Sequence, residues 1–213
     1  MALSKVNFNS LNVTPSASKA IKFNSSNNGL ETGDIGGNLI LLSTQTASSS
    51  ANISFTSGID STYKEYVFKF IDIHMATSDA SFTVNFRDGG SNYDATKTTT
   101  FFRAYHNEGG SAQALTYSSS TDLAQSTSAQ SIITSNGTDN DMSASGTLHL
   151  FDPSSTTFVK HFLSDCHVYH KDDYSQRLLV AGYANVTAAI DGVQFGSSSG
   201  NIDAGTIKMY GVL

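Results

Sequence analysis

Residues 64–74 read KEYVFKFIDIH, and their pattern decides the fold class of the chain. Three aromatic residues lie two positions apart, from Tyr66 to Phe70, which is the period of a half-buried β-strand. After Phe70 the apolar positions shift by one residue, to Ile71 and Ile73. A β-bulge adds one residue to one strand of a pair and produces such a shift. The stretch therefore predicts a bulged β-strand.

Short β-like runs of this kind continue from Asn38 to the end of the chain, and none keeps a helical period over three turns. Turn residues such as Asn136-Gly137 separate them. The pattern predicts an all-β, jelly-roll-like antiparallel β-sandwich over residues 38–213, with Phe68 and Phe158 in its core. The predicted strands are 39–43, 51–56, 64–74, 81–87, 98–106, 147–151, 156–163, 176–184, 193–195 and 205–212.

Residues 1–37 differ from the rest because they hold only isolated apolar residues, such as Phe8 and Phe23. These are too few to bury an independent core. We interpret the segment as an extended N-terminal arm that serves anchoring or trimerisation and is ordered by a neighbouring subunit or by a particle. A disordered leader is the alternative.

Composition limits the partners and the compartment. Charged residues make up 14% of the chain, against roughly 25% in an average soluble protein. The resulting neutral, hydroxyl-rich surface suits permanent assembly. The net charge is −6 without a cluster of Lys and Arg, which argues against nucleic-acid binding.

We expect no membrane insertion, because there is no apolar run of about 18 residues. Because residues 1–12 do not read as a signal peptide, we expect synthesis in a cytoplasm, and the lone Cys166 has no disulfide partner.

Three groups of residues carry possible metal ligands. The first is the stretch 165–173, which reads DCHVYHKDD and is preceded by His161. Zinc sites usually draw ligands from two separated pairs, and no second pair follows, so a polar loop is the favoured interpretation. Two acidic loops are short enough to wrap calcium, but turns that hydrogen-bond their own backbone account for them better. We therefore predict no metal and no cofactor. The candidate ligands are Cys166, His167 and His170, then Asp88, Asn92 and Asp94, and finally Asp139, Asn140 and Asp141.

Catalysis is not indicated. The chain has no nucleophile elbow, metalloprotease helix, P-loop or dinucleotide fingerprint. Acidic residues such as Glu65, Asp72 and Asp203 do not by themselves point to glycoside hydrolysis. We predict that the protein is not an enzyme.

Aromatic residues suggest two contact surfaces. The chain has 13 Phe and 9 Tyr but no Trp, the usual platform for a sugar ring, so glycan binding would have to use tyrosines. The candidates for such binding are Tyr93, Tyr105, Tyr117 and Tyr169. A second aromatic sheet face, suited to subunit contact, is suggested by Phe151, Tyr183 and Tyr210.

Four stretches of the chain carry a family resemblance. They read GNLILLSTQTASSSANISFTSGIDSTYKEYVFKFIDIH (37–74), FRDGGSNYDATKTTTFFRAYHNE (86–108), LHLFDPSSTTFVKHF (148–162) and GNIDAGTIKMYGVL (200–213). The chain resembles virion structural proteins of marine tailed phages, notably cyanophages. The resemblance implies a place on the virion and no catalytic residues.

Together with the residue patterns, the resemblance favours a capsid decoration, cement or fibre component that assembles as a homotrimer and contacts other virion proteins. The alternative is a tail-associated receptor-binding module on the same scaffold that binds host surface glycans.

Overall fold

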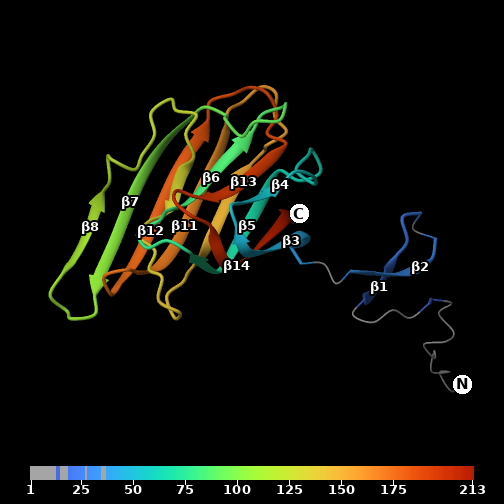
Figure 1. Ribbon diagram of the computed structural model, residues 1–213. Helices are drawn as coiled ribbons and strands as arrows, with labels where there is room; N and C mark the ends of the chain where they lie inside the picture. The colour runs from blue at the N-terminus through green and yellow to red at the C-terminus, as the bar shows by residue number, and fades with distance from the viewer. Residues whose placement is uncertain (1–12, 15–18, 27, 35–36) are drawn as a thin grey trace, which may run out of the picture. The chain divides into compact units, whose positions relative to one another are not determined.

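The computed structural model describes residues 13–14, 19–26, 28–34 and 37–213. The chain divides into two compact units, Met1–Asn38 and Leu39–Leu213. The described part of the first unit is an antiparallel hairpin of β1 (Lys19–Phe23) and β2 (Leu30–Asp34), drawn in blue in Figure 1. Most of the predicted arm before β1, including Phe8, lies outside the described residues.

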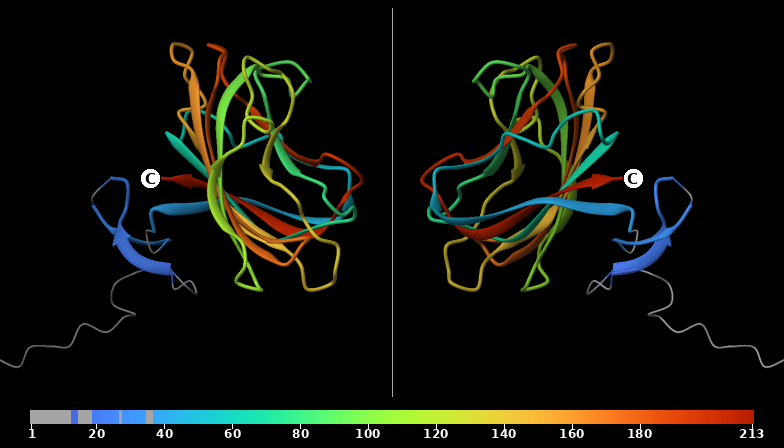
Figure 2. Two further views of the ribbon diagram at one scale, coloured as in Figure 1. Left: turned by 90° about the vertical axis from the view of Figure 1, so that its left-hand side faces the viewer. Right: turned by 90° about the vertical axis from the view of Figure 1, so that its right-hand side faces the viewer.

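The second unit consists of two antiparallel sheets, which confirms the predicted all-β sandwich (Figures 1 and 2). Among the described residues, no helix is long and apolar enough to cross a membrane. The large sheet has eight strands, in the order β3 (Leu39–Ser50), β14 (Ile202–Val212), β5 (Glu65–Met75), β10 (Ala144–Phe151), β11 (Lys160–His170), β12 (Tyr174–Ala184), β7 (Lys97–Asn107) and β8 (Gln113–Tyr117). The small sheet has four, in the order β4 (Asn52–Phe55), β13 (Gly192–Ser197), β6 (Phe82–Arg87) and β9 (Gln130–Ile133).

The strand order is that of a jelly roll with two insertions. In the orders β3-β14-β5-β10 and β4-β13-β6-β9, consecutive strands of this set lie in opposite sheets except β6 and β9, which pair within the small sheet, as in two interleaved Greek keys. The β7–β8 hairpin is inserted between β6 and β9, and the β11–β12 hairpin between β10 and β13. Both hairpins join the large sheet beyond β10, in the order β11-β12-β7-β8. The insertions therefore widen one sheet of the sandwich and leave the other unchanged.

Phenylalanine rings fill the space between the sheets. The Phe195 ring stacks on Phe82 with centroids 5.5 Å apart and meets Phe55, Phe68 and Phe70 edge-on. Each of these five side chains is at most 2% exposed. Edge-to-face aromatic pairs add to the stabilisation from burial itself. The prediction that Phe68 lies in the core is confirmed.

The predicted bulge in β5 is also present. Gly146 of β10 pairs with Phe70 and Ala144 pairs with Ile73, so β5 uses one residue more than β10 over this interval. Asp72 lies inside the bulge with a positive φ of 51°. The extra residue is the reason that the apolar positions of β5 shift from even to odd numbers.

Two sequence predictions about β11 were wrong. The strand begins at Lys160 and not near residue 156, and Phe158 precedes it with a side chain that is 70% exposed. Phe158 is therefore not a core residue. The stretch from Asp165 to His170 is part of the same strand and not a polar loop. In a strand these residues point alternately to opposite faces, which puts His167 on the opposite face from Cys166 and His170.

Candidate functional site

The outer face of the large sheet, which points away from the small sheet, is unusually apolar. Strand β11 alternates strictly between buried and exposed residues from Lys160 to His167, with Phe162 buried and Leu163 exposed. Strands β12 and β7 show the same alternation over residues 175–180 and 99–102. The outward positions nevertheless hold large apolar side chains. We call the following residues the outer apolar patch: Leu163 (50% exposed), Leu179 (38%), Phe102 (41%), Leu115 (74%) and Tyr117 (47%).

Strand register aligns these side chains across neighbouring strands. Leu179 of β12 pairs with Phe102 of β7, and Phe102 pairs with Tyr117 of β8. Directly paired residues project from the same face of a sheet. The rings of Phe102 and Tyr117 meet edge-on, with centroids 5.1 Å apart. The outer apolar patch is therefore continuous from β11 to β8.

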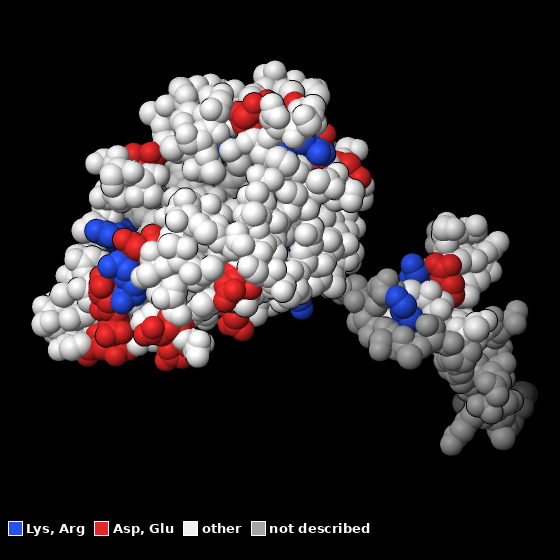
Figure 3. All heavy atoms as spheres, viewed as in Figure 1, with Lys and Arg blue, Asp and Glu red and all other residues white. Residues whose placement is uncertain are grey.

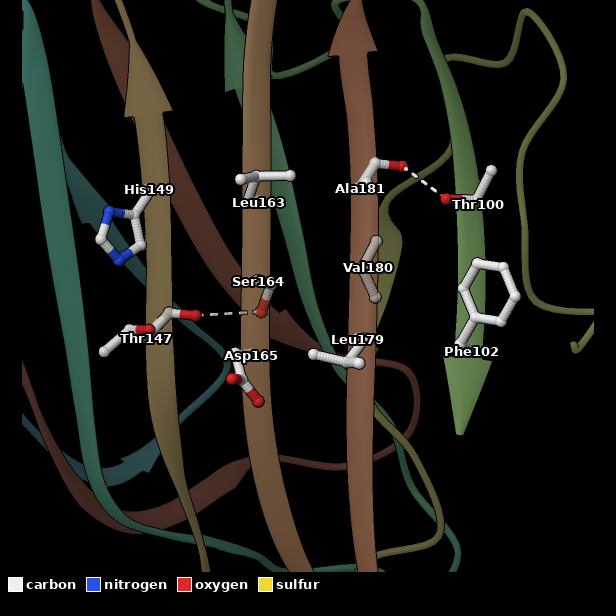
Figure 4. A pocket seen from close by; sticks show the side chains of 10 residues that line it. All are labelled: Thr100, Phe102, Thr147, His149, Leu163, Ser164, Asp165, Leu179, Val180 and Ala181. Carbon is white, nitrogen blue, oxygen red and sulfur yellow. Dashed lines mark hydrogen bonds between the residues drawn. The ribbon is translucent and has the colours of Figure 1, made fainter. Parts of the chain in front are cut away.

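A hollow of about 390 Å³ lies within this patch (Figure 4). Ser164, one of its lining residues, is buried, and its hydroxyl donates to the Thr147 carbonyl at 3.1 Å. Leu163, Leu179 and Phe102 project from three neighbouring strands around it, as Figure 4 shows. The lining residues are Thr100, Phe102, Thr147, His149, Leu163, Ser164, Asp165, Leu179, Val180 and Ala181.

The outer face continues beyond the hollow toward β3. Tyr210 of β14 pairs with Leu41 of β3 on one side and with Val67 of β5 on the other. Val67 in turn pairs with His149, and His149 with Leu163. The three aromatic residues that the sequence suggests for a second aromatic face occupy outward positions on their strands, namely Phe151, Tyr183 and Tyr210.

Charged groups on this face mostly neutralise one another within the subunit. Arg177 donates two hydrogen bonds to Asp165, from Nε at 2.9 Å and from Nη2 at 2.6 Å, and the pKa of Asp165 is lowered by this partner. His149 Nδ1 lies 2.6 Å from Glu65 Oε1. Bidentate Arg–carboxylate pairs are the strongest of the exposed type. The face can therefore meet an uncharged partner without leaving these four groups unpaired.

Two lysines are the exception. Lys69 of β5 and Lys208 of β14 pair directly across the sheet. Lys69 Nζ lies 5.2 Å from the centroid of the Tyr210 ring, a cation–π arrangement. Neither ammonium forms a salt bridge with a carboxylate in the part of the chain that the structure describes.

A second, more polar hollow of about 360 Å³ lies at the end of the sheet where β11 turns into β12. Tyr169 and Tyr174 line it together with His106, Glu108 and His167. The pKa of Tyr169 is raised to about 12 by partial removal from solvent and by the neighbouring carboxylates, of which Glu108 contributes most. The Tyr169 hydroxyl is therefore a hydrogen-bond donor at neutral pH.

The tyrosines that the sequence suggests for glycan binding do not form one platform. Tyr169 lines the polar hollow, whereas Tyr117 belongs to the outer apolar patch. Tyr105 stacks on Tyr174 with a centroid distance of 5.5 Å, and Tyr93 lies beside Arg87.

The metal candidates of β11 are divided between the two faces. Cys166 is buried, burial raises the pKa of its thiol to about 12, and its sulfur lies 3.3 Å from the Ser164 hydroxyl. His167 points outward and contacts the Ser175 hydroxyl at 2.9 Å. His170 is buried, and its Nδ1 accepts the Asp172 backbone N–H. Cys166 and His167 therefore lie on opposite faces of the sheet and do not converge on one point.

The acidic candidates lie in separate places, and three of them lie around one hollow. Asp203 lies 3.4 Å from His74, and both line a shallow hollow together with Asp72 and Asp141, whereas Glu65 lies at the other end of β5. In the described part of the chain, no group of three or more His, Cys, Asp and Glu side chains is placed to hold a metal ion. Asp88 and Asp94 belong to the other acidic loop. Their negative charges partly oppose the lowering of the pKa of Lys97 by burial.

Sequence reasoning missed most of the outer apolar patch, although the sequence contains a signal for it. Three neighbouring strands carry adjacent apolar pairs, namely Phe162-Leu163, Leu178-Leu179 and Phe101-Phe102. In a strand, such a pair puts one apolar side chain on each face. Three such strands side by side indicate a sheet that carries large apolar side chains on both faces.

Comparison with known proteins identified no relative: no family model, no curated protein and no solved structure matches the chain.

Proposed function

We propose that this protein is a structural component of a phage virion that acts by assembly, and that the outer apolar patch is its contact surface with a second copy of the same chain. The observation that carries the proposal is the alignment of Leu163, Leu179 and Phe102 on one exposed sheet face. Contiguous apolar patches on soluble proteins mark interaction sites. The family resemblance and the jelly-roll topology, which is common in viral capsid proteins, agree with this assignment.

A second copy suits this face better than a charged partner does. Asp165 and Arg177 neutralise each other within one subunit, and Glu65 Oε1 lies 2.6 Å from His149 Nδ1 of the same subunit. Contact of the outer apolar patch with a neighbouring copy around the axis therefore buries apolar side chains and leaves the Asp165–Arg177 pair intact, while Lys69 and Lys208 lie on other strands, β5 and β14. Subunit contacts of this type have apolar centres that are depleted in charge. The proposed assembly is a homotrimer in which the large sheets surround the symmetry axis.

The rest of the surface is poor in charge as well. Figure 3 shows one side of the domain on which Lys, Arg, Asp and Glu are sparse over the centre and lie mainly near its margins, at the lower left and along the top. Short polar side chains lose little conformational entropy when they are packed against another protein. A surface of this kind is consistent with a capsid decoration, cement or fibre protein surrounded by other virion proteins.

The N-terminal arm would attach the assembly to its neighbour on the particle. In the described hairpin, Phe23 is 71% exposed and Ile21 is 40% exposed, so two apolar side chains of β1 are available for contact. The partner proposed for them is another virion protein, such as the major capsid protein or a tail protein.

The oligomeric state tests the assembly proposal. We expect the purified chain to sediment as a trimer and Leu179→Asp to sediment as a folded monomer, because a charge in the patch opposes its burial. Phe158→Asp is the matched control, since Phe158 is 70% exposed and precedes β11. That variant should remain trimeric. A monomeric wild-type chain, or a trimeric Leu179→Asp variant, would contradict the proposal.

Host glycan recognition is the second candidate function, and the polar hollow beside Tyr169 favours it. Tyr169 and Tyr174 offer rings, and Glu108 and His106 offer hydrogen-bonding groups, at one accessible place. A sugar site typically combines an aromatic surface with such polar groups. A glycan array probed with the wild-type chain and with Tyr169→Ala tests it: binding that the variant loses supports recognition, and no binding by either removes this candidate.

A further inference from the structure

Two lysine side chains are completely buried on the inner face of the large sheet. Lys97 of β7 and Lys160 of β11 both pair with Ala184 of β12, so they lie on either side of it. Both residues are 0% exposed. In the described part of the chain, neither forms a salt bridge. Burial of an ammonium without an opposite charge costs several kcal/mol, so the two positions require an explanation.

The neighbours of the two amines differ in chemistry. Lys160 Nζ donates to the backbone carbonyls of Val186, at 3.0 Å, and Ala188, at 2.5 Å. Lys97 Nζ donates to the Ala95 carbonyl at 2.8 Å and to the side-chain oxygen of Asn85 at 2.5 Å. Lys97 therefore contacts a side-chain amide, whereas Lys160 contacts only backbone carbonyls.

The Asn85 amide is held in a fixed orientation. Its Oδ1 accepts the backbone N–H of Phe86 at 3.1 Å in addition to the Lys97 amine. Its Nδ2 donates to the Thr127 carbonyl at 3.1 Å. Asn85 lies on β6 of the small sheet and is 9% exposed, whereas Lys97 is the first residue of β7 in the large sheet. An amine and an amide carbonyl are thus in contact, away from solvent, between the two sheets.

The protonation state of Lys97 favours reaction as well. Burial lowers the pKa of its amine to about 8, and the carboxylates of Asp94 and Asp88 oppose this shift only in part. With a pKa of about 8, roughly a tenth of the side chain is the neutral amine at pH 7. The neutral amine is the nucleophilic form of lysine.

We propose that Lys97 and Asn85 form an intramolecular amide cross-link. The Nζ–Cγ bond forms, the Cγ–Nδ2 bond breaks, one proton passes from Nζ to Nδ2, and the side-chain nitrogen of Asn85 leaves as ammonia. The Phe86 N–H faces the oxygen on which negative charge develops in the tetrahedral intermediate, as a donor of an oxyanion hole does. The reaction consumes no oxidant and no further reactant.

The surroundings fit the product better than they fit an ammonium. A secondary amide has one N–H and one carbonyl oxygen, and these would meet the Ala95 carbonyl and the Phe86 N–H that Nζ and Oδ1 already contact. An ammonium has three N–H donors, and Lys97 has two acceptors within the described residues. The cross-link would join the two sheets covalently in a chain whose single cysteine cannot form an internal disulfide. This inference does not depend on the proposed assembly.

The mass of the intact full-length chain tests the proposal. We expect the denatured protein to be lighter than its sequence by about 17 Da, the mass of the ammonia released when lysine acts as the nucleophile. Trypsin should then release residues 70–87 joined to residues 88–103. An unchanged mass would overturn the proposal. So would an ammonia loss that maps to Asn136-Gly137, a sequence that can cyclise by itself.

Variants of both lysines provide the control. Lys97→Met keeps the length of the side chain and should restore the mass expected from the sequence, whereas Lys160→Met should keep the loss. Circular dichroism establishes that each variant is folded. If Lys97→Met does not fold, Asn85→Leu removes the amide from the other side and should also restore the full mass. A loss that persists in a folded Lys97→Met or Asn85→Leu variant contradicts the assignment.

Discussion

The inner and outer faces of the large sheet carry similar side chains in different surroundings. Phe101 is 1% exposed and contributes to the core, while its neighbour Phe102 is 41% exposed on the outer face. Leu178 and Leu179 repeat the contrast on the adjacent strand, at 0% and 38%. The comparison teaches that the same apolar residue types can lie in the core on one face of a strand and remain exposed on the other, where we propose that they serve association.

The largest effect should come from the inner member of the Phe101–Phe102 pair. Phe101→Ala removes a buried ring and leaves a cavity, and we expect a loss of about 3–5 kcal/mol in the free energy of unfolding. Chemical denaturation measures it. Phe68→Ala, at 0% exposure, should behave in the same way. A loss below about 1 kcal/mol for either would mean that the core is not between the two sheets.

The success and failure of sequence reasoning follow this contrast. Alternation identified the large-sheet strand β5 and its bulge, because one face of that strand is fully buried and the pattern is local. The prediction for Phe158 was wrong because Phe158 continues the alternating pattern of Lys160 and Phe162 toward the N-terminus. It lies two residues before Lys160, where β11 begins. A local pattern does not show where the opposing sheet ends, and so it cannot show which aromatic residue is the last one buried.

Strands β9 and β8 were not predicted from the sequence, for a different reason. Strand β9 has only four residues, Gln130–Ile133, in a stretch rich in Ser and Thr, and three of them are buried by contacts distant in sequence. Strand β8, Gln113–Tyr117, is an edge strand whose exposed positions include Leu115. The outer apolar patch depends on the register of such strands, which is set by non-local pairing.

The buried Lys160 offers a second way to test the inner face. Burial lowers the pKa of its amine in the folded protein, with Asp152 and Asp88 opposing the shift. Between this lowered pKa and the ordinary value of 10.5, the unfolded chain binds more protons than the native one. The contribution of Lys160 to the free energy of unfolding should therefore rise as the pH increases from the lowered pKa toward 10.5. Below the lowered pKa the buried amine is charged, and its full destabilising effect on the folded protein is present.

This contribution is isolated by measuring the denaturation of the wild-type chain and of Lys160→Met from pH 7 to pH 10. Ionisation of the tyrosines and of the other lysines affects both proteins equally, so it cancels in the difference. The difference in the free energy of unfolding should move in favour of the wild type as the pH rises. Parallel curves would mean that the amine is solvated in the folded protein, and the inner face would then be open to water at this end of the sandwich.

The smallest effect on subunit stability should come from the outer member of the pair. Phe102→Ala removes an edge-on contact with Tyr117 but leaves no enclosed cavity, so a loss of about 1 kcal/mol or less is expected. The measurement is made in the monomeric Leu179→Asp background, which separates folding from association. In the otherwise wild-type chain, the same substitution should weaken the trimer, which dilution experiments by sedimentation would detect. A loss in the monomeric background as large as that of Phe101→Ala would show that the outer face also supports folding, and the distinction between the two faces would then fail.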